Sequence, residues 1–527
     1  MRRHCPNETP GRRPVSTARR SLALGLFASL ATSCFTGDEG RRPSPSELYY
    51  PTAILTSPGG TTLFVANSNF DLQFSGGSVF ALDLEAMRTA VTPIATGFAE
   101  GGEATAVCAS VGLAPNDNPW IEPGPCRAFG VGGFVRSFAF TGTFASGMAL
   151  TSNPDGEGAR LFVSVRSDPS ITYFDVADDR DGPAGFALNC QQNEDNFCGF
   201  EHRIGQDPTD SGRSLTLAAD PVGLATSRDG SLVVAAHQTQ QASSLVSNPW
   251  DGVPSLAFTL TNLASGPNAV TSLPEPALVA EAEETLSYTP GFAISFRGAP
   301  EVDVVRFIPD AGSVPARPFL TREGVFPVTV NASAFDSRGI AVWDAPLRSC
   351  EAGCEGSSVR ASCLALCAER APSLVFMANR SPASLVVSEL RLTLNERDGQ
   401  PRGLSHEVVP FSTIPLNFGP TRVEVGQVID PDGELVDRIF AVCFDARQIF
   451  IIDPTTLTVE RVIRTGRGPQ DIAFDIDVDS DERHAFLYVA HFTDSYVAVA
   501  DLDQRRPRTY GQLFASIGEP VPPIEVQ

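Results

Sequence analysis

The sequence predicts an all-β fold built from repeated strand units, and three observations support this fold class. The chain of 527 residues contains 45 Gly and 42 Pro beside 42% hydrophobic residues, a balance typical of a folded protein with many turns. A β-hairpin pattern recurs along the chain, and a further strand follows most copies at a regular spacing. Paired cysteines and an early apolar segment indicate an exported protein.

The hairpin pattern combines a short alternating strand, a Gly- or Asp-rich turn and a strongly apolar strand. Four segments show it: PTAILTSPGGTTLFVANS from Pro51, SGMALTSNPDGEGARLFVSV from Ser146, PVGLATSRDGSLVVAAHQ from Pro221 and PQDIAFDIDVDSDERHAFLYVAHF from Pro469. Period-two alternation bounded by turn residues is typical of a β-hairpin. The same hairpin is therefore expected at least four times.

A third strand follows the hairpin in most copies. Examples are SVFALDL from Ser78, ITYFDV from Ile171, SLVVSEL from Ser384, QIFIIDP from Gln448 and YVAVADL from Tyr496. Where the two strands can be paired, this strand begins nine or ten residues after the start of the one before it. A fourth strand, such as VERVIRTG, precedes the next Gly-Pro, so each repeat predicts a four-stranded sheet.

The segment IFAVCFDARQIFIIDPTTLTVERVIRTGRGPQDIAF, followed by LYVAHFTDSYVAVADLD, resembles the YVTN-type repeat, in which each unit is one blade of a β-propeller. The resemblance is specific over residues 419–503 and 51–84 and poor between 240 and 372. It implies a β-propeller of about seven four-stranded blades, with six or eight as alternatives. It also implies that the Pro-containing first strand lines the central channel.

Stacking of blades in a ring also follows from physics, because one blade cannot bury both faces of its own sheet. Closure of the ring is expected to use a strand from one terminus that completes a blade begun at the other. The candidates are the strand before Pro51 and the tail YGQLFASIG. The long insertions at residues 100–130 and 181–212 are expected to project as loops from one rim.

Residues 1–33 are predicted to be a signal peptide, because arginines precede the apolar run SLALGLFASLATS, which is too short to span a bilayer. The small residues before Cys34 resemble a bacterial lipobox, which implies a lipid on Cys34; an ordinary secretory peptide cut nearby is the alternative. Residues 34–47 are expected to form a flexible tether. Residues 48–527 then form a single propeller domain. Phe35, by resemblance to lipoprotein sorting patterns, implies the outer membrane.

The charge balance argues against two classes of partner. The formal net charge is −23, and all 39 basic residues are arginine. Removal of residues 1–33, which hold six Arg and one Glu, gives −23 − 5 = −28. Such a chain repels phosphate backbones and anionic lipid headgroups, so nucleic-acid binding and electrostatic attachment to membranes are not expected.

Eight cysteines are candidates for disulfide bonds. They are Cys108, Cys126, Cys190 and Cys198, which form two close pairs, and Cys350, Cys354, Cys363 and Cys367 in the motif CEAGC…CLALC. An i, i+4 pair lies on one face of a helix, so two such helices at about residues 347–371 would be joined as a hairpin by Cys350–Cys367 and Cys354–Cys363. Zinc binding is the alternative. Cys443, in the apolar run IFAVCF, is expected to be a buried free thiol.

Motifs of common enzyme classes are missing from the sequence. It contains no GxSxG pentapeptide, no HExxH motif and no Walker loop, and its three Trp are too few for the docking motifs that quinone-dependent propeller dehydrogenases share. The run DIDVDSDE would offer oxygen ligands to Ca²⁺ if it formed a loop, through Asp475, Asp477, Asp479 and Asp481. The alternative is a solvated acidic turn.

Polar residues at repeated positions give two further hypotheses. His237 and His491 share a register with Asn67 and Asn379 at the end of the second strand, where a turn-shaping role is expected because these residue types tolerate strained backbone. By analogy with the repeat, Arg422, Gln470 and Asp471 are candidates to line the channel.

The sequence thus predicts a non-catalytic propeller lipoprotein, anchored to the membrane, that acts as a binding or scaffolding module in the cell envelope. Its expected partner is an envelope protein, a peptide or a glycan, engaged by the rim loops or the channel mouth. The alternative is a propeller enzyme such as a metal-dependent lactonase, with its site at the channel mouth.

Overall fold

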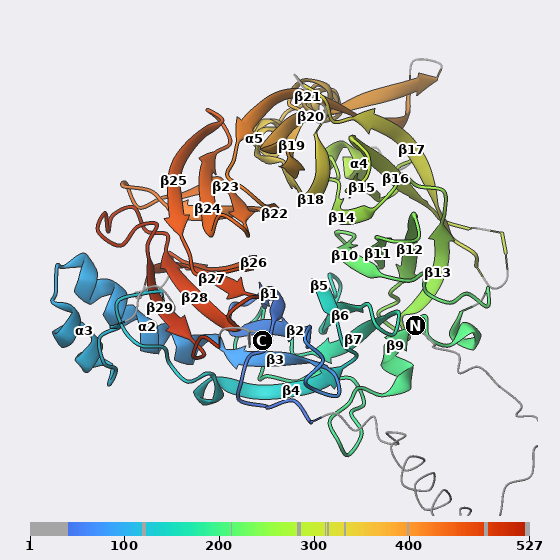
Figure 1. The fold of residues 1–527 in the computed structure, drawn as a ribbon. Coiled ribbons are helices and arrows are strands. Elements are labelled where there is room, and N and C mark those ends of the chain that lie inside the picture. Colours follow the sequence, from blue (N-terminus) through green and yellow to red (C-terminus); the bar gives the residue numbers. More distant parts are fainter. Residues whose placement is uncertain are drawn as a thin grey trace, which may run out of the picture.

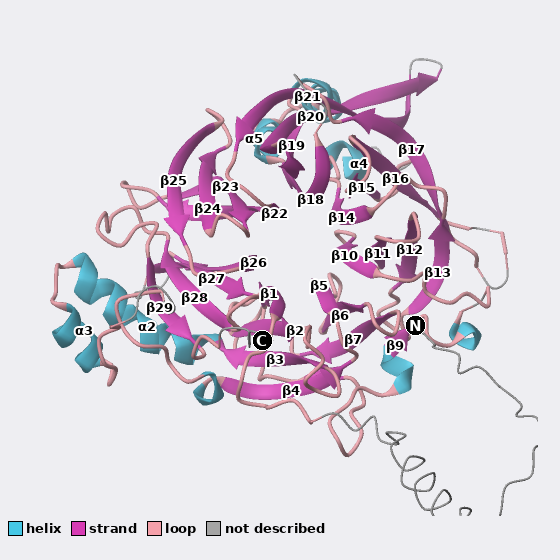
Figure 2. Ribbon diagram, in the orientation of Figure 1, coloured by secondary structure: helices cyan, strands magenta, loops and turns pink. Residues whose placement is uncertain are grey.

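The computed structural model describes residues 41–117, 123–211, 213–281, 286–310, 312–313, 316–330, 334–397, 400–478 and 483–521. They form seven antiparallel sheets arranged radially around a central channel, which is a seven-bladed β-propeller (Figure 1). Strands dominate, and the few helices lie outside the seven sheets (Figure 2). The predicted fold class is confirmed, with seven blades. None of the helices in these ranges combines the length and the apolar character that a membrane span requires.

Each blade is a continuous piece of chain whose strands run in order from the channel to the outside. Blade 1 comprises β1 (Pro51–Thr56), β2 (Thr62–Asn67), β3 (Gly77–Asp83) and β4 (Val135–Thr141). Blade 2 comprises β5 (Ala145–Ser152), β6 (Ala159–Val165), β7 (Ser170–Val176), β8 (Leu188–Asn189) and β9 (Arg203–Ile204). Blade 3 comprises β10 (Pro221–Thr226), β11 (Leu232–His237), β12 (Ala242–Ser247) and β13 (Ser255–Leu260). In blade 2 the outer position is divided, because β8 and β9 both pair with β7.

The same order holds in the second half of the chain. Blade 4 comprises β14 (Pro267–Ser272), β15 (Gly291–Phe296), β16 (Glu301–Ile308) and β17 (Phe319–Pro327), and blade 5 comprises β18 (Phe335–Trp343), β19 (Ser373–Ser381), β20 (Ala383–Arg397) and β21 (Gln400–Pro415). Blade 6 comprises β22 (Pro420–Ile429), β23 (Leu435–Cys443), β24 (Gln448–Asp453) and β25 (Thr458–Arg464). Blade 7 comprises β26 (Pro469–Asp477), β27 (His484–His491), β28 (Tyr496–Asp501) and β29 (Leu513–Ile517).

Within the described ranges, helices occur only in insertions between strands. They are α2 (Leu84–Ala99) and α3 (Ala104–Ser110) in blade 1, α4 (Ala277–Glu281) in blade 4, α5 (Ala345–Ala352) and α6 (Arg360–Arg370) in blade 5, and the 3-10 turns η2 (Val131–Gly133), η3 (Phe200–His202) and η4 (Pro208–Asp210).

The core lies between neighbouring blades, which explains the continuous apolar runs of the middle strands. Every residue of β2, β27 and β28 is buried, because both faces of these strands are covered by adjacent sheets. Between blades 6 and 7, for example, Val442 and Ile449 belong to the same core cluster as Leu487. Mutual burial of sheet faces therefore stabilises the ring.

The predicted closure of the ring by strand exchange is wrong. The tail YGQLFASIG does supply β29, but all other strands of blade 7 also come from the carboxyl-terminal part, and blade 1 is complete within residues 51–141. Closure instead uses contacts between whole blades. The backbone N–H of Tyr50 donates to Ser495 Oγ (3.0 Å), and the first strands β1 and β26 lie side by side.

The insertion between β3 and β4, part of which was expected to be a projecting loop, is instead a packed clasp. Leu84, Met87, Val91 and Ile94 recur at helical spacing on α2, and all four side chains are buried in one cluster with Phe514 of blade 7. Asp83, the acidic residue that ends β3, caps this helix by accepting from the Ala86 N–H (2.9 Å). The described part of the insertion therefore covers the seam between the first and last blades.

The end of the same insertion also extends the last sheet. The Phe129 N–H donates to the Ser516 carbonyl (2.9 Å), and the Gly518 N–H donates to the Phe129 carbonyl (2.8 Å). The disulfide Cys108–Cys126 ties this segment to α3. A segment of blade 1 thus pairs with the outer strand of blade 7.

The predicted disulfide bonds are present. The structure forms Cys108–Cys126, Cys190–Cys198, Cys350–Cys367 and Cys354–Cys363. The last two join α5 to α6 as a helical hairpin, as the cysteine spacing suggested. Cys443 is a buried free thiol in β23, and burial raises its pKa to about 12.

Candidate functional site

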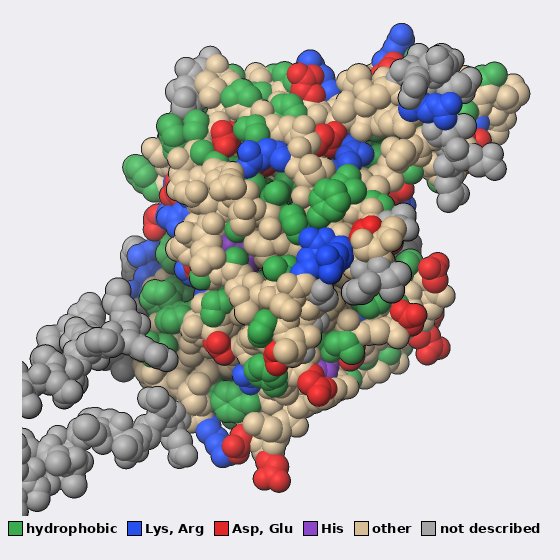
Figure 3. Space-filling model, turned by 90° about the vertical axis from the view of Figure 1, so that its right-hand side faces the viewer, with side chains coloured by type: hydrophobic (Ala, Val, Ile, Leu, Met, Phe, Trp, Pro, Cys, Tyr) green, Lys and Arg blue, Asp and Glu red, His purple; other side chains and the backbone are tan. Residues whose placement is uncertain are grey.

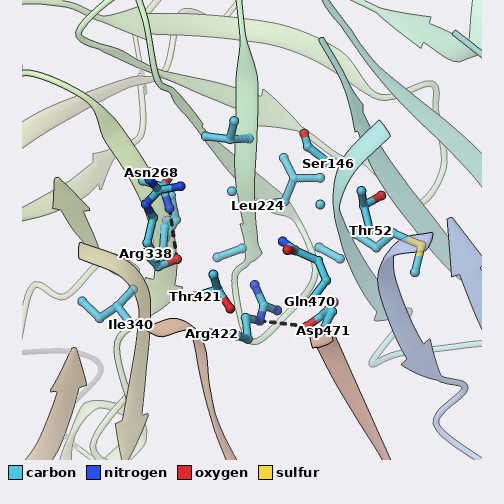
Figure 4. Close-up of a pocket in the computed structure, with 18 of the residues that line it drawn as sticks. Thr52, Ser146, Leu224, Asn268, Arg338, Ile340, Thr421, Arg422, Gln470 and Asp471 are labelled. Atoms are coloured by element: carbon cyan, nitrogen blue, oxygen red, sulfur yellow. Dashed lines mark hydrogen bonds and ion pairs between the residues drawn. The ribbon is translucent and has the colours of Figure 1, made fainter. Parts of the chain in front are cut away.

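The central channel holds a cavity with a volume of about 750 Å³. Each of the seven first strands contributes to its wall, as Figure 4 shows. One wall residue from each blade is Thr52, Ser146, Leu224, Asn268, Ile340, Thr421 and Gln470. The wall is therefore mixed in character, with hydroxyl and amide groups beside aliphatic side chains.

A charged trio, of which only Asp471 is buried, occupies one side of the channel. The Arg422 guanidinium lies 3.0 Å from Asp471 and 2.6 Å from Glu424. Burial raises the pKa of both carboxyls, and the nearby guanidinium opposes this rise. Burial lowers the pKa of Arg422, but the two carboxylates outweigh it and hold the pKa above its ordinary value. The Arg422 side chain is still 38% exposed, so a ligand in the channel can reach it.

One mouth of the channel lies at the end where the first strands begin. The second strands end there, since Pro51 pairs with Asn67 and Pro469 with His491. The connections that follow the second strands therefore surround this mouth. They supply Phe70, Phe444 and Phe492, while Phe144 comes from the connection that leads into β5.

Aromatic rings form a continuous group at this mouth, which we call the aromatic rim. Its members are Tyr50, Phe70, Phe144, Phe444 and Phe492, with neighbouring ring centroids 5.2–6.2 Å apart. Such separations are typical of favourable aromatic contacts. The Phe70 side chain is nevertheless 56% exposed, so the rim presents an apolar surface to a ligand.

Arginines occupy other positions around the same mouth, and three of them pair with an acid of a neighbouring blade. Arg166 of blade 2 pairs with Asp220 before blade 3, Arg297 of blade 4 with Asp336 of blade 5, and Arg380 of blade 5 with Asp445 of blade 6. These pairs join adjacent blades, and Asp336 also pairs with Arg338 of its own blade, which lines the channel, so this carboxylate faces two guanidinium groups. A guanidinium carries five N–H donors, so one carboxylate does not use them all.

The structure places Arg422, Gln470 and Asp471, the residues predicted to face the channel, in its wall. The Gln470 side chain is labelled beside the Arg422–Asp471 pair in Figure 4. Sequence analysis missed Glu424 and the aromatic rim. For Glu424 a signal existed, because it lies two positions after Arg422 and so on the same face of β22.

Two of the four aspartates proposed as calcium ligands lie in a strand and not in a loop. Asp475 and Asp477 lie in β26, whereas Asp479 and Asp481 lie outside the described residues. The Asp475 carboxylate is buried and lies 3.0 Å from the Arg88 guanidinium and 3.1 Å from His484 Nε2. Calcium binding stays a prediction.

The four residues that share a register are strand residues with buried side chains. Asn67, His237, Asn379 and His491 lie at or near the ends of the second strands of their blades, and none of them has a positive φ, so the expectation of a strained turn is wrong. Burial lowers the pKa of His237 to about 4 and of His491 to about 3, which keeps both imidazoles neutral. Their rings instead make local contacts, such as His237 Nε2 with Ser244 Oγ at 2.8 Å.

Metal ligands do not converge in the described part of the channel. Over the described ranges, one group of three His, Cys, Asp or Glu side chains brings its donor atoms within 4.8 Å of one another, and it consists of Cys354, Cys363 and Cys367. These cysteines are engaged in disulfide bonds. In the channel, Asp471 and Glu424 share one guanidinium, which competes with a cation for both carboxylates.

Comparisons with known proteins leave the family open. No family model matches the chain, and no curated protein matches its sequence. Among solved structures, Kuenenia stuttgartiensis hydrazine synthase is 14% identical with a TM-score of 0.41, over 86% of this chain and 96% of that chain. A candidate 6-phosphogluconolactonase from Bacteroides fragilis is 15% identical with a TM-score of 0.44, over 91% and 98%.

A third similar structure is the periplasmic gluconolactonase PpgL of Pseudomonas aeruginosa. It is 17% identical with a TM-score of 0.34, over 71% of this chain and 97% of that chain. These values are too low to carry an argument about activity. Function is therefore inferred from the residues of the channel.

Proposed function

We propose that the chain is a non-catalytic binding propeller of the bacterial cell envelope, anchored by a lipid on Cys34, and that its channel mouth binds a glycan. The observation that carries this proposal is the meeting of two kinds of surface at one mouth. The aromatic rim lies on one part of it, and amide, carboxyl and guanidinium groups line the channel. Ligand sites commonly combine an apolar surface with a few placed polar groups.

A glycan fits this combination better than an ion or an apolar ligand. Sugar rings present flat C–H faces, which pack on aromatic side chains, and hydroxyl groups, which both donate and accept hydrogen bonds. Each arginine in the described channel wall is paired with a carboxylate, so a neutral ligand meets no unpaired guanidinium there. The cavity volume of about 750 Å³ also lies in the usual range for small-ligand sites.

The location in the envelope is supported by the four disulfide bonds, which form and persist in oxidising compartments. The lipid on Cys34 and the outer membrane are the remaining parts of the proposal. Mass measurement of the mature protein tests the lipid. The Cys34→Ala variant should lose the acyl mass and leave the membrane fraction; unchanged retention would count against the anchor.

A glycan array tests the binding function. The purified full chain in detergent should retain a subset of bacterial envelope glycans, and Phe70→Ala should lose this retention because Phe70 is the most exposed ring of the rim. Phe200→Ala is the matched control, since Phe200 is 52% exposed and lies in η3, between the outer strands β8 and β9 of blade 2. The proposal fails if the unmodified chain binds no glycan, or if both variants bind as it does.

A further inference from the structure

We infer that the aromatic rim and the adjacent Leu72 contact the surface of a lipid bilayer, so that the channel mouth opens toward the membrane. The inference rests on the proposed function, because it needs the lipid on Cys34. It deepens that proposal, since a mouth that faces the bilayer binds a ligand that the bilayer presents. The glycan is then the headgroup of a membrane glycolipid.

The first argument is where the amino-terminal segment meets the propeller. The Arg41 carbonyl accepts a hydrogen bond from the Ser75 N–H (3.0 Å), and the Arg41 guanidinium lies 5.9 Å from the centre of the Phe74 ring. Phe74 and Ser75 belong to the connection between β2 and β3, which also carries Phe70 and Leu72. The described chain therefore begins at the same connection that supplies the exposed part of the rim.

The second argument is the length of the tether. Seven peptide units separate Cys34 from Arg41, and at no more than about 3.6 Å each they span at most roughly 25 Å. A chain this short keeps its attachment point close to the bilayer. The attachment point lies on the mouth side of the propeller, so this side is held near the lipid and the opposite side is turned away.

The third argument is the chemistry of the surface beside the attachment point. On a different side of the molecule, Figure 3 shows apolar side chains scattered among polar ones. Phe70 is 56% exposed and Leu72 is 60% exposed, although both are apolar. Leu72 has a φ of 58°, a left-handed conformation that leucine rarely adopts, in a turn closed by its N–H to the Asn69 carbonyl (3.1 Å). The turn thus keeps an apolar side chain exposed at its tip. Apolar side chains beside a lipid anchor strengthen membrane attachment.

Charge indicates what kind of membrane contact this is. The chain that begins at Cys34 carries a net charge of −23 − 5 = −28, so attraction to anionic lipids does not contribute. The contact is therefore apolar and does not require an anionic lipid. Vesicles of a neutral lipid are the appropriate probe.

The test measures the depth of two surface positions in the lipidated full chain. Leu72→Cys places a thiol on the rim side, and Thr455→Cys places one in the exposed turn after β24, at the opposite end of the blades. Each is labelled with an environment-sensitive dye; the free thiol Cys443 is buried. The proteins are bound to dioleoylphosphatidylcholine vesicles with and without its brominated analogue, which quenches dyes close to lipid.

The inference expects strong quenching of the dye at position 72 and none at position 455. If the chain floats with the vesicles but the dye at position 72 is not quenched, or both dyes are quenched equally, the orientation is wrong and the anchor stands. If the chain does not float with the vesicles in a density gradient, it is not attached to lipid. The anchor is then absent, and the inference fails together with that part of the proposed function. Glycan retention on the array is read separately and is unaffected by either result.

Discussion

The backbone N–H of Ile54 in the first blade donates a hydrogen bond to the carboxylate of Asp471 in the last blade, 3.1 Å away, although the residues are 417 positions apart. Asp471 also pairs with Arg422 of blade 6. This one carboxylate thus links its own blade, blade 7, to both neighbouring blades at the channel. Because the described strands are not exchanged between the ends of the chain, contacts of this kind and the helical clasp close the ring.

The Asp471 contacts give the first prediction. Asp471→Asn keeps an acceptor for the Ile54 N–H and leaves Arg422 paired with Glu424, so it should change the free energy of unfolding by less than about 1 kcal/mol. Asp471→Ala removes the acceptor and should cost about 2 kcal/mol. Urea unfolding of the two variants measures the difference. Equal losses for both would show that charge, rather than the hydrogen bond to blade 1, matters at this position.

The clasp gives the second prediction. Removing the Cys108–Cys126 bond by a double Ser substitution should lower stability by about 3 kcal/mol and reduce hydrogen-exchange protection of β29, which pairs with Phe129. The Cys190–Cys198 bond is the control, because it closes a shorter loop and lies in blade 2, away from the seam. Its removal should leave protection of β29 unchanged. Loss of that protection in both variants would contradict the role of the clasp.

The third prediction concerns pH. Burial raises the pKa of Asp303 in β16 to about 6, although Arg322 opposes the rise. The folded chain therefore holds a proton that the unfolded chain releases near the ordinary pKa. The protonated Asp303 therefore contributes to the free energy of unfolding below its ordinary pKa, and this contribution is lost as the pH rises to about 6. Asp303→Asn removes this loss.

The measurement is the free energy of unfolding of the Asp303→Asn variant relative to that of the original chain, from urea unfolding at several pH values. The difference should move in favour of the variant between about pH 4 and about pH 8, by up to about 3 kcal/mol. The Arg322 side chain is 36% exposed and stays solvated without its partner. A difference that does not change with pH would rule out titration of Asp303 in this range.

The sequence predicted the blades well because strands covered on both faces become continuous apolar runs, as in the buried TLFVAN of β2 and HAFLYVAH of β27. It failed where a feature depends on ring closure. Phe70, Phe144 and Phe492 are far apart in the chain, and only the closed ring brings their side chains together. The helix α2 was missed although its apolar residues recur at helical spacing, since Pro93 interrupts the pattern.

The fourth prediction concerns the cysteine-rich insert, which packs on blade 5 and on α4 of blade 4 through a small core of its own. Leu347 and Leu364 belong to a cluster with Leu392 of β20, Leu404 of β21 and Leu278 of α4, distinct from the cluster between blades 5 and 6. Replacing Cys350, Cys354, Cys363 and Cys367 by Ala should therefore release α5 and α6 while the propeller stays folded. Trypsin should then cut at Arg360, which lies at the start of α6, without a change in the main unfolding transition.

The reason for this independence is the position of the insert in the fold. It lies between β18 and β19, the first two strands of one blade, and those strands pair with each other from Phe335 to Trp343 whether or not the helices are ordered. The two bonds close short loops, so their loss acts mainly on the local equilibrium of the hairpin. A fall of the main transition together with the trypsin cut would instead make the insert part of the cooperative unit. The helices would then stabilise the packing of blade 5 against its neighbours.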